Sequence, residues 1–452
     1  MKHMPRIFGS FMLKGCGWAV ALSAGVGCGS DAASPSSTDM PGSTTPEFSA
    51  SPGGGDSPSI DAPSDPAPNA AAAPVVTPVP TATPATGDNS EVVPVPVAPP
   101  VSNAEVGAGA VPSDTSNMPA PVGETPPAVG PEPDAASRLV CTGSDPISCH
   151  FGGPPGNYDV TVVLGGEVAA NTRVLAETRR VMLGPVATAA GETRRFTFGV
   201  NVRQPEGEPI QAVPAGTPGL DLYFQGAAGG APALQAIGYA PAADPLMIYV
   251  AGDSTVADQN GAEYGGWAQQ LPQHFDYPVV VANYSDSGES SGSFLNARPL
   301  FGAIESQLQA NDWVLIQFGH NDKTVTAAQF HDNMTSLVAR VKAKSALPVL
   351  LTPVARAQFN GNAVSTQHVN GTGANLPQIV AQVAREQNVP LLDLTALTTQ
   401  WLSEVGPNGW QAFHALGTDV THTNDAGAAV EAGFVRDLLL GAQLDGLTSH
   451  LR

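Results

Sequence analysis

Basic residues are scarce in this chain of 452 residues. Lys and Arg together number 19 against 40 Asp and Glu, so the formal net charge is −21 at pH 7. Proteins that bind nucleic acid neutralise its phosphates with Lys and Arg, so this balance argues against a nucleic-acid partner. The shortage is greatest between Gly29 and Ser137, where neither Lys nor Arg occurs.

Cysteine is also scarce, with 4 residues in the whole chain. Cys16 and Cys28 lie near the N-terminus, which leaves Cys141 and Cys149 for folded sequence. We expect these two to form a short-loop disulfide, as suits an exported protein. A metal site at this pair is not expected, because no neighbouring His or Cys completes a ligand set of the usual spacing.

The N-terminus lacks an apolar run long enough for a comfortable membrane span. Residues 1–28 instead have the pattern of an export signal, in which basic residues precede the short apolar stretch 18–26. Cys28, followed by Gly-Ser-Asp, is similar to the acceptor cysteine of bacterial lipoproteins. We therefore expect export and lipid attachment to the bacterial cell envelope at Cys28, with ordinary secretion as the alternative.

Composition separates a tether from a first folded domain. Residues 29–138 are mainly Pro, Ala, Ser, Thr, Gly and Val, and such a segment buries too little apolar surface to fold alone. Residues 139–245 contain short alternating runs separated by Gly and Pro, which predicts a small β-sandwich that acts as a packing partner or a carbohydrate-binding module. Its expected strands include residues 158–162, 195–202 and 220–224.

In residues 246–445, apolar strand-like runs alternate with helical periodicity. We expect strands at 246–251, 278–282, 313–318, 347–352 and 389–394, and helices at 267–275, 327–344, 376–387 and 425–440. Crossover helices must cover both faces of a parallel sheet, so this order predicts an α/β fold, a three-layer α/β/α sandwich around five parallel strands.

Four short motifs follow these runs or open a helix. They are Gly252-Asp-Ser254, Asn283-Tyr-Ser-Asp-Ser-Gly288, Phe318-Gly-His-Asn-Asp322 and Asp419-Val-Thr-His422. A serine hydroxyl becomes a nucleophile when a base takes its proton and a third group orients that base. His422 can be the base and Asp419 can orient it, because one tight turn carries both. The sequence therefore predicts a triad of Ser254, His422 and Asp419.

This order of motifs resembles the SGNH, or GDSL-type, hydrolase superfamily. The resemblance implies that the N–H groups of Ser254 and Gly288 and the side-chain amide of Asn321 form an oxyanion hole, each donor contributing on the order of 10²–10³ in rate. A glycine at 288 would also let the backbone approach the substrate closely. No metal or organic cofactor is expected, because these groups supply nucleophile, proton transfer and charge stabilisation together.

Within the superfamily, the passages Gly252-Asp-Ser-Thr-Val-Ala257, Tyr264-Gly-Gly-Trp267 and Gln317-Phe-Gly-His-Asn-Asp322 are most similar to the rhamnogalacturonan acetylesterase branch of carbohydrate esterases. This implies removal of O-acetyl groups from plant cell-wall polysaccharide, with no obligate protein partner. Glu289 stands where such enzymes often have Arg, so acetylated xylan or another neutral glycan stays open beside rhamnogalacturonan. Substrate contacts are expected from Asp253, Trp267, His320 and Arg356.

Several residues have a second interpretation. Ser290 lies in Gly288-Glu-Ser-Ser-Gly292, which matches the nucleophile elbow of α/β-hydrolases, and His150-Phe-Gly-Gly153 imitates an oxyanion loop. The elbow requires a sharp turn directly after the strand, and three residues intervene here, so Ser254 is favoured. Structural or surface roles are the default for a further set of polar residues: Asp253, Asp322, His320, His368 and His414.

Two other functions stay open. One is an SGNH lipase, arylesterase or thioesterase that acts on other acyl esters, for which a long acyl chain would need an apolar groove. The other is a non-catalytic surface adhesin whose sandwich binds glycan. Intact catalytic motifs favour an enzyme.

Overall fold

The computed structural model describes residues 130–210, 216–365 and 368–452. The predicted export signal, Cys28 and most of the predicted tether lie outside the described residues. The described residues belong to one compact unit, Pro112–Arg452. Within it, Glu132 pairs with Arg195 and Asp134 forms a bridge with Ile237, so contacts with the first folded domain begin before residue 139.

The first folded part is a sandwich of two antiparallel sheets. One sheet has the order β1-β6-β3-β4 and the other β5-β2-β7. The strands are Ile147–Phe151 (β1), Gly156–Gly165 (β2), Ala170–Ala176 (β3), Arg180–Thr188 (β4), Thr193–Val202 (β5), Leu220–Gly226 (β6) and Leu234–Pro241 (β7). Apolar side chains from both sheets form one core, so the predicted β-sandwich is confirmed.

A disulfide joins Cys141 to Cys149 in this part of the chain. Cys149 lies in β1 and is buried in the sandwich core, whereas Cys141 directly follows the short 3-10 helix Ser137–Val140. The bond therefore ties the segment that enters the sandwich to its first strand.

The second folded part is built on five parallel strands in the order β14-β11-β10-β8-β9. The strands are Leu246–Ala251 (β8), Val279–Asn283 (β9), Trp313–Gln317 (β10), Leu347–Leu351 (β11) and Leu391–Leu392 (β14). Both faces are buried because side chains alternate along each strand: Tyr249 and Ala251 enter one core, whereas Ile248 and Val250 enter the other.

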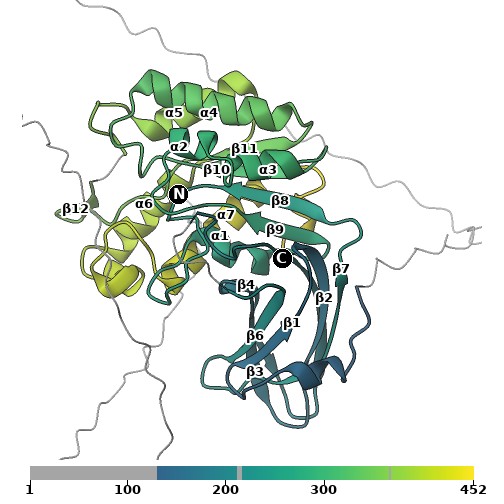
Figure 1. Cartoon of the computed structure of the whole chain (residues 1–452). Helices are drawn as coiled ribbons and strands as arrows, with labels where there is room; N and C mark the ends of the chain where they lie inside the picture. The colour runs from purple at the N-terminus through teal and green to yellow at the C-terminus, as the bar shows by residue number, and fades with distance from the viewer. Residues whose placement is uncertain (1–129, 211–215, 366–367) are drawn as a thin grey trace, which may run out of the picture. The chain divides into compact units, whose positions relative to one another are not determined.

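Helices cover both faces of this sheet (Figure 1). On one face pack α2 (Ser291–Asn296), α3 (Phe301–Gln307), α4 (Ala327–Lys342) and α5 (Leu376–Gln387). On the other pack α1 (Trp267–Gln270), the start of α6 (Leu394–Val405) and α7 (Asp425–Ala442), with Leu447 and Leu451 extending this core beyond residue 445. The predicted three-layer α/β/α sandwich with five parallel strands is confirmed.

The structure differs from the predicted elements in several places. The helix expected at 267–275 is one α-helical turn followed by a 3-10 helix, Leu271–His274. The strand expected at 389–394 is only two residues long, and α6 begins directly after it. The short helices α2 and α3 were not predicted. A small hairpin of Phe359–Asn360 (β12) and Ala363–Val364 (β13) also lies outside the main sheet.

Among the described helices, none combines the length and apolarity that crossing a bilayer requires.

Candidate active site

Three neighbouring strands deliver the predicted motifs to one edge of the sheet. Strands β9, β8 and β10 lie side by side and parallel, so the loops that leave their carboxyl ends meet. A pocket of about 350 Å³ opens there. It is lined by Ser254, Gln259, Tyr264, Ser287, Gly288, Asn321 and His422.

An unbroken chain of hydrogen bonds runs from Ser254 to Asp419. Ser254 Oγ lies 2.8 Å from His422 Nε2, and His422 Nδ1 lies 2.8 Å from Asp419 Oδ2. An ionised carboxylate only accepts hydrogen bonds, so the Nδ1 proton points to Asp419 and Nε2 is left to accept the Ser254 hydroxyl proton. This is the arrangement in which an imidazole acts as a general base toward serine.

The Asp419 carboxylate is held in place by its own turn. Its Oδ1 accepts hydrogen bonds from the backbone N–H groups of Thr421, at 2.8 Å, and His422, at 3.0 Å. Burial would raise the pKa of Asp419, but the bonds from His422 and Thr421 outweigh it, so this pKa is lowered and the carboxylate stays charged.

The loop that carries His422 is anchored on both sides. His414 Nδ1 lies 2.9 Å from the Asp419 carbonyl oxygen, and the Ala415 N–H donates to the His422 carbonyl. Asn424 then caps α7 by accepting from the N–H groups of Ala426 and Gly427. His414 is buried and therefore structural rather than a surface residue.

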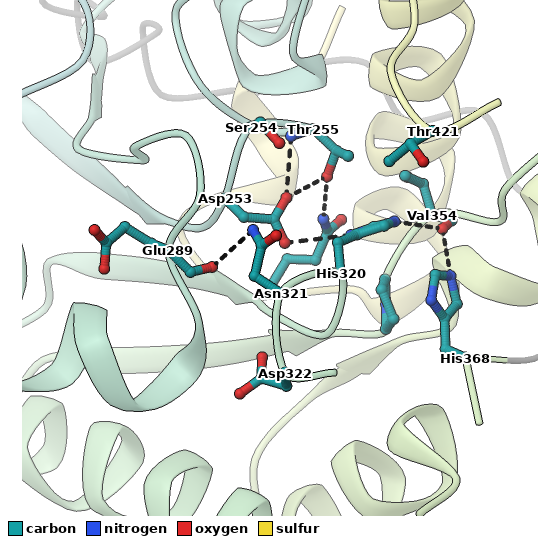
Figure 2. Close-up of polar contacts among 12 residues, drawn as sticks. Asp253, Ser254, Thr255, Glu289, His320, Asn321, Asp322, Val354, His368 and Thr421 are labelled. Atoms are coloured by element: carbon teal, nitrogen blue, oxygen red, sulfur yellow. Dashed lines mark hydrogen bonds and ion pairs between the residues drawn. The ribbon is translucent and has the colours of Figure 1, made fainter. Parts of the chain in front are cut away.

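Gly288 and Asn321 face the same pocket as Ser254. Gly288 has φ +84, in the left-handed region that favours glycine, and a Cβ added there would meet no atom within 4 Å. Glycine thus suits the backbone conformation at 288, and the open space beside it is compatible with the expected close approach of a substrate. Asn321 Nδ2 donates to the Glu289 carbonyl oxygen at 3.1 Å, which ties the two loops together (Figure 2).

A buried polar network lies beneath the Ser254 loop (Figure 2). Asp253 accepts from the Thr255 N–H at 3.0 Å and from Thr255 Oγ1 at 2.7 Å, and it lies 3.2 Å from His320 Nδ1. Burial would raise the pKa of Asp253, but His320 and Thr255 outweigh it and the pKa is lowered. Asp253 therefore shapes the loop, which was its default interpretation.

Two of the predicted substrate contacts are wrong. Asp253 and Trp267 are both 0% exposed, so neither side chain can reach a polysaccharide. Trp267 packs in the sheet core, and its Nε1 donates to Gln317 Oε1 at 2.9 Å. Gln317 in turn donates to Thr255 Oγ1 at 2.9 Å, so Trp267 supports the nucleophile loop from behind.

A second cavity has a volume of about 310 Å³. His320 and Lys323 border it from the β10–α4 loop, and Arg356 borders it from the segment after β11. Arg356 donates to the His320 carbonyl at 3.1 Å and to Thr421 Oγ1. The rings of His320 and His368 both approach the Val354 carbonyl oxygen, at 3.0 Å and 2.6 Å (Figure 2). Burial lowers the pKa of His368 to about 3, so it is a neutral structural histidine.

Ser290 caps a helix in this structure. Its hydroxyl accepts from the Ser293 N–H at 3.2 Å, and its own N–H donates to Ser293 Oγ at 2.9 Å, which is a capping box at the start of α2. Asp322 secures the same helix by accepting from Ser291 Oγ at 2.6 Å, and burial raises the pKa of Asp322 to about 6. The nucleophile-elbow interpretation of Ser290 is therefore wrong.

The resemblance of His150-Phe-Gly-Gly153 to an oxyanion loop is also not supported. His150 lies on β1 of the sandwich, where its Nδ1 is 2.8 Å from Asp221 Oδ1. His150 thus contacts an acid of the accessory domain and not a serine. Across the described residues, moreover, no three or more His, Cys, Asp or Glu side chains gather in a way that could hold a metal ion.

Sequence reasoning missed three residues of the pocket. Gln259 Nε2 donates to the Ser254 carbonyl at 3.0 Å and to Ser287 Oγ at 3.2 Å. Tyr264 meets the His422 ring edge-on, with ring centroids 5.9 Å apart. The Tyr264-Gly-Gly-Trp267 passage was a usable signal for Tyr264. Ser287 lies inside the Asn283–Gly288 motif, which was likewise a usable signal, whereas no local pattern marks Gln259 because its position depends on the loop path.

Comparisons with known proteins identify the family of the chain. Residues 250–430 match the model of the GDSL-like lipase/acylhydrolase family. Rhamnogalacturonan acetylesterase RhgT of Bacillus subtilis (strain 168) is 34% identical over 169 residues, which cover 36% of this chain and 71% of that protein. The uncharacterized esterase YxiM of the same organism is 29% identical over 289 residues, or 61% of this chain and 69% of the relative. The crystal structure of YxiM aligns with a TM-score of 0.43 and 26% identity over 67% of this chain and 82% of that one. The predicted SGNH, or GDSL-type, character is thus confirmed, and the chain belongs to the GDSL-like lipase/acylhydrolase family of ester hydrolases.

Proposed function

We propose that the protein is a serine esterase that removes O-acetyl groups from plant cell-wall polysaccharide. The observation that carries this proposal is the hydrogen-bonded chain Ser254–His422–Asp419, which opens into a pocket shared with Gly288 and Asn321. Nucleophile, base and oxyanion donors are then within reach of one carbonyl group.

In the first half of the reaction, Ser254 Oγ forms a bond to the acetyl carbonyl carbon while His422 Nε2 takes its proton. The carbonyl oxygen becomes an oxyanion that accepts hydrogen bonds from the N–H groups of Ser254 and Gly288 and from the Asn321 amide. The oxyanion then collapses to a carbonyl group and the bond from carbon to the sugar oxygen breaks. His422 gives the proton taken from Ser254 to that oxygen, which leaves as a sugar hydroxyl group.

In the second half, water attacks the acetyl group on Ser254 and His422 takes a proton from the water. The second oxyanion collapses, Ser254 Oγ leaves and recovers the proton from His422, and acetate is released. Asp419 keeps its negative charge throughout and stabilises the imidazolium that forms twice in the cycle.

The pocket lining offers no aliphatic groove for a long acyl chain. Its seven residues are polar or glycine apart from the aromatic ring of Tyr264, and no aliphatic side chain is among them. A lipase or thioesterase for long acyl chains would need an apolar groove, so an acetyl ester is the better match. Other short acyl esters are the second candidate.

The polysaccharide class rests on relatives. Two proteins of Bacillus subtilis are named rhamnogalacturonan acetylesterase or probable rhamnogalacturonan acetylesterase, at 34% and 29% identity. We extend that substrate class to this chain and keep Arg356, which borders the cavity beside the Phe318–Asp322 motif, as a proposed contact for the sugar chain. His320 borders the same cavity but is 2% exposed, so we propose that its part there is to support Arg356 through its carbonyl.

The test is acetate release from acetylated rhamnogalacturonan and acetylated xylan, side by side. We expect release by the wild type and none by Ser254→Ala, with the faster polymer naming the substrate. A 4-nitrophenyl ester series from acetate to decanoate measures acyl preference in the same samples. Hydrolysis of decanoate faster than acetate, or no acetate from either polymer, would contradict the proposal.

We further propose that the protein is exported and attached to the cell envelope through a lipid on Cys28. The pattern of residues 1–28 is the basis for this proposal. Mass spectrometry of the mature N-terminus tests it: a diacylglycerol mass on Cys28 is expected, and an unmodified peptide containing Cys28 would exclude the anchor.

A further inference from the structure

The accessory sandwich reaches the catalytic pocket through the loop that follows β5. Glu208, in this loop, accepts hydrogen bonds from the Ser287 N–H at 2.8 Å and from the Ser287 hydroxyl. Two residues further, the Ile210 N–H donates to Asp286 Oδ2 at 2.8 Å. The accessory domain therefore forms hydrogen bonds with the two residues that directly precede Gly288, Asp286 and Ser287.

The conformation of Ser287 bears on the direction of the Gly288 N–H. The two residues share one peptide plane, and Gly288 continues from it in the left-handed conformation, with φ +84. Both residues line the pocket with Ser254. The bonds to Glu208 fix the preceding peptide, Asp286–Ser287, and the Ser287 side chain, so rotation about Ser287 ψ is the main remaining way to turn the Gly288 N–H.

The loop that carries Glu208 is itself firmly anchored. Arg203 donates to the Gly207 carbonyl and lies 3.6 Å from Asp258 Oδ2, while Arg180 of β4 lies 3.3 Å from the same oxygen. Asp258 is 1% exposed and belongs to the catalytic domain, four residues after Ser254. A buried carboxylate between two arginines fixes one end of the loop.

A second contact from the sandwich supports two further residues of the pocket lining. Arg179, in the turn between β3 and β4, donates to the carbonyl oxygens of Gln259 at 3.0 Å and Tyr264 at 3.2 Å. It also pairs with Asp425, the first residue of α7. The sandwich thus touches the segments on either side of the pocket, as a fixed part of the catalytic unit would and a freely tethered glycan-binding module would not.

We propose that Glu208 is a positioning residue for the oxyanion hole, and that the accessory β-sandwich completes the active site by holding the Asp286–Gly288 loop in its working conformation. The catalytic part of this inference rests on the proposed esterase function. The positioning part concerns the loop alone and can be measured without substrate.

Three variants test the inference. Glu208→Ala removes Glu208 Oε1, the one oxygen that accepts both Ser287 hydrogen bonds. Glu208→Gln keeps a neutral acceptor of the same size. Because burial raises the pKa of Glu208 to about 7, the variants are compared at about pH 8.5, where the carboxylate is ionised and accepts hydrogen bonds about twice as strong as neutral ones. Tyr277→Phe is the matched control, because it removes another hydrogen bond between the domains, from Tyr277 to Asp159 at 3.1 Å, just before the amino end of β9.

Hydrogen exchange by mass spectrometry follows residues 283–290, and kcat and KM are measured with 4-nitrophenyl acetate. In Glu208→Ala we expect exchange of this segment to rise about 10-fold or more. We expect kcat to fall by about 10–100-fold, less than the 10²–10³ for losing a donor outright, with KM changed by no more than about 3-fold. Glu208→Gln should be intermediate, and Tyr277→Phe should match the wild type.

The outcomes separate the two proposals. Unchanged exchange in Glu208→Ala overturns the positioning role whatever the activity, and faster exchange with wild-type kcat overturns its catalytic consequence. If exchange is faster in Glu208→Ala but the wild type hydrolyses no acetyl ester, the positioning role is supported and the proposed function is rejected. If Glu208→Ala does not fold, the same criteria apply to Glu208→Gln, and an equal loss of kcat in Tyr277→Phe overturns the specific role of Glu208.

Discussion

Ser254 Oγ lies 2.8 Å from His422 Nε2, although 168 positions separate the two residues in the chain. Ser254 follows the first strand of the parallel sheet, whereas His422 precedes its last helix. The contact therefore exists only when the whole domain is folded, and loss of global stability would remove activity together with the pairing. Tests of individual residues must separate these two causes.

Ser254→Ala is expected to lower kcat by on the order of 10⁵-fold or more while leaving the melting temperature within about 2 °C of wild type, because only one hydroxyl is removed. Steady-state hydrolysis of 4-nitrophenyl acetate and thermal unfolding of the same samples measure both effects. Ser290→Ala is the matched control: it removes a helix cap, so it should cost about 1 kcal/mol of stability with kcat nearly unchanged. Loss of activity in Ser290→Ala alone would contradict the assignment.

Asp419→Asn should lower kcat by about 10⁴-fold with little change in KM, since the amide can donate to the imidazole and favour the wrong tautomer. The lowered pKa of Asp419 adds a pH expectation. A carboxyl whose pKa is depressed stays ionised above its ordinary value, so titration of Asp419 should not shape the rate between about pH 5 and pH 8. A pH–rate profile of the wild type checks this, and an Asp419→Asn enzyme with more than about a tenth of wild-type kcat would contradict the triad.

Helices and strands whose apolar residues recur with a clear period were predictable from the sequence. Elements whose ends depend on a capping side chain were not. The apolar run Leu246–Ala251 and the helix Leu376–Gln387 have the bounds that their patterns indicate. The apolar residues around Leu391 and Leu394 suggested one long strand, but the Asp393 side chain accepts from the Ala396 N–H and starts α6 there. A local hydrogen bond overrides an apolar run in such a place. The helices α2 and α3 have only 6 and 7 residues, too few to establish a period.

The site shows a similar division between motif and packing. The motifs after β8, β9 and β10 were expected to meet because parallel strands align their carboxyl ends, and the triad chemistry added His422 and Asp419 from the segment before α7. The direction of a side chain could not be predicted: Trp267 points into the core, although Tyr264 of the same motif lines the pocket. The contact between Glu208 and Ser287 joins two domains across 79 positions, so no local pattern encodes it.

Trp267→Phe tests the correction that this residue is structural. The phenyl ring keeps most of the buried apolar surface but leaves Gln317 Oε1 without the bond from the indole N–H. An unsatisfied buried acceptor costs about 1–3 kcal/mol, so the free energy of unfolding in urea should fall by that amount. KM for acetylated polymer should stay within about 2-fold of wild type, because the side chain is fully buried. A large rise in KM with unchanged stability would restore the substrate-binding interpretation.

Glu431, a buried carboxyl of α7, should make the protein less stable as pH rises. Burial raises its pKa to about 8 from an ordinary value of 4.5, with a 3.4 Å contact to Thr423 Oγ1 opposing the shift. Between these two values the folded protein holds a proton that the unfolded chain has released, so stability falls as pH increases through this window. Glu431→Gln removes the titration while keeping the shape of the side chain. From about pH 5 to pH 8 its unfolding free energy should therefore decline by on the order of 2–4 kcal/mol less than that of the wild type. Urea unfolding at both pH values measures this difference, with the exposed Glu404→Gln as the control that should follow the wild type. Equal declines in Glu431→Gln and wild type would mean that Glu431 is already ionised in the folded protein.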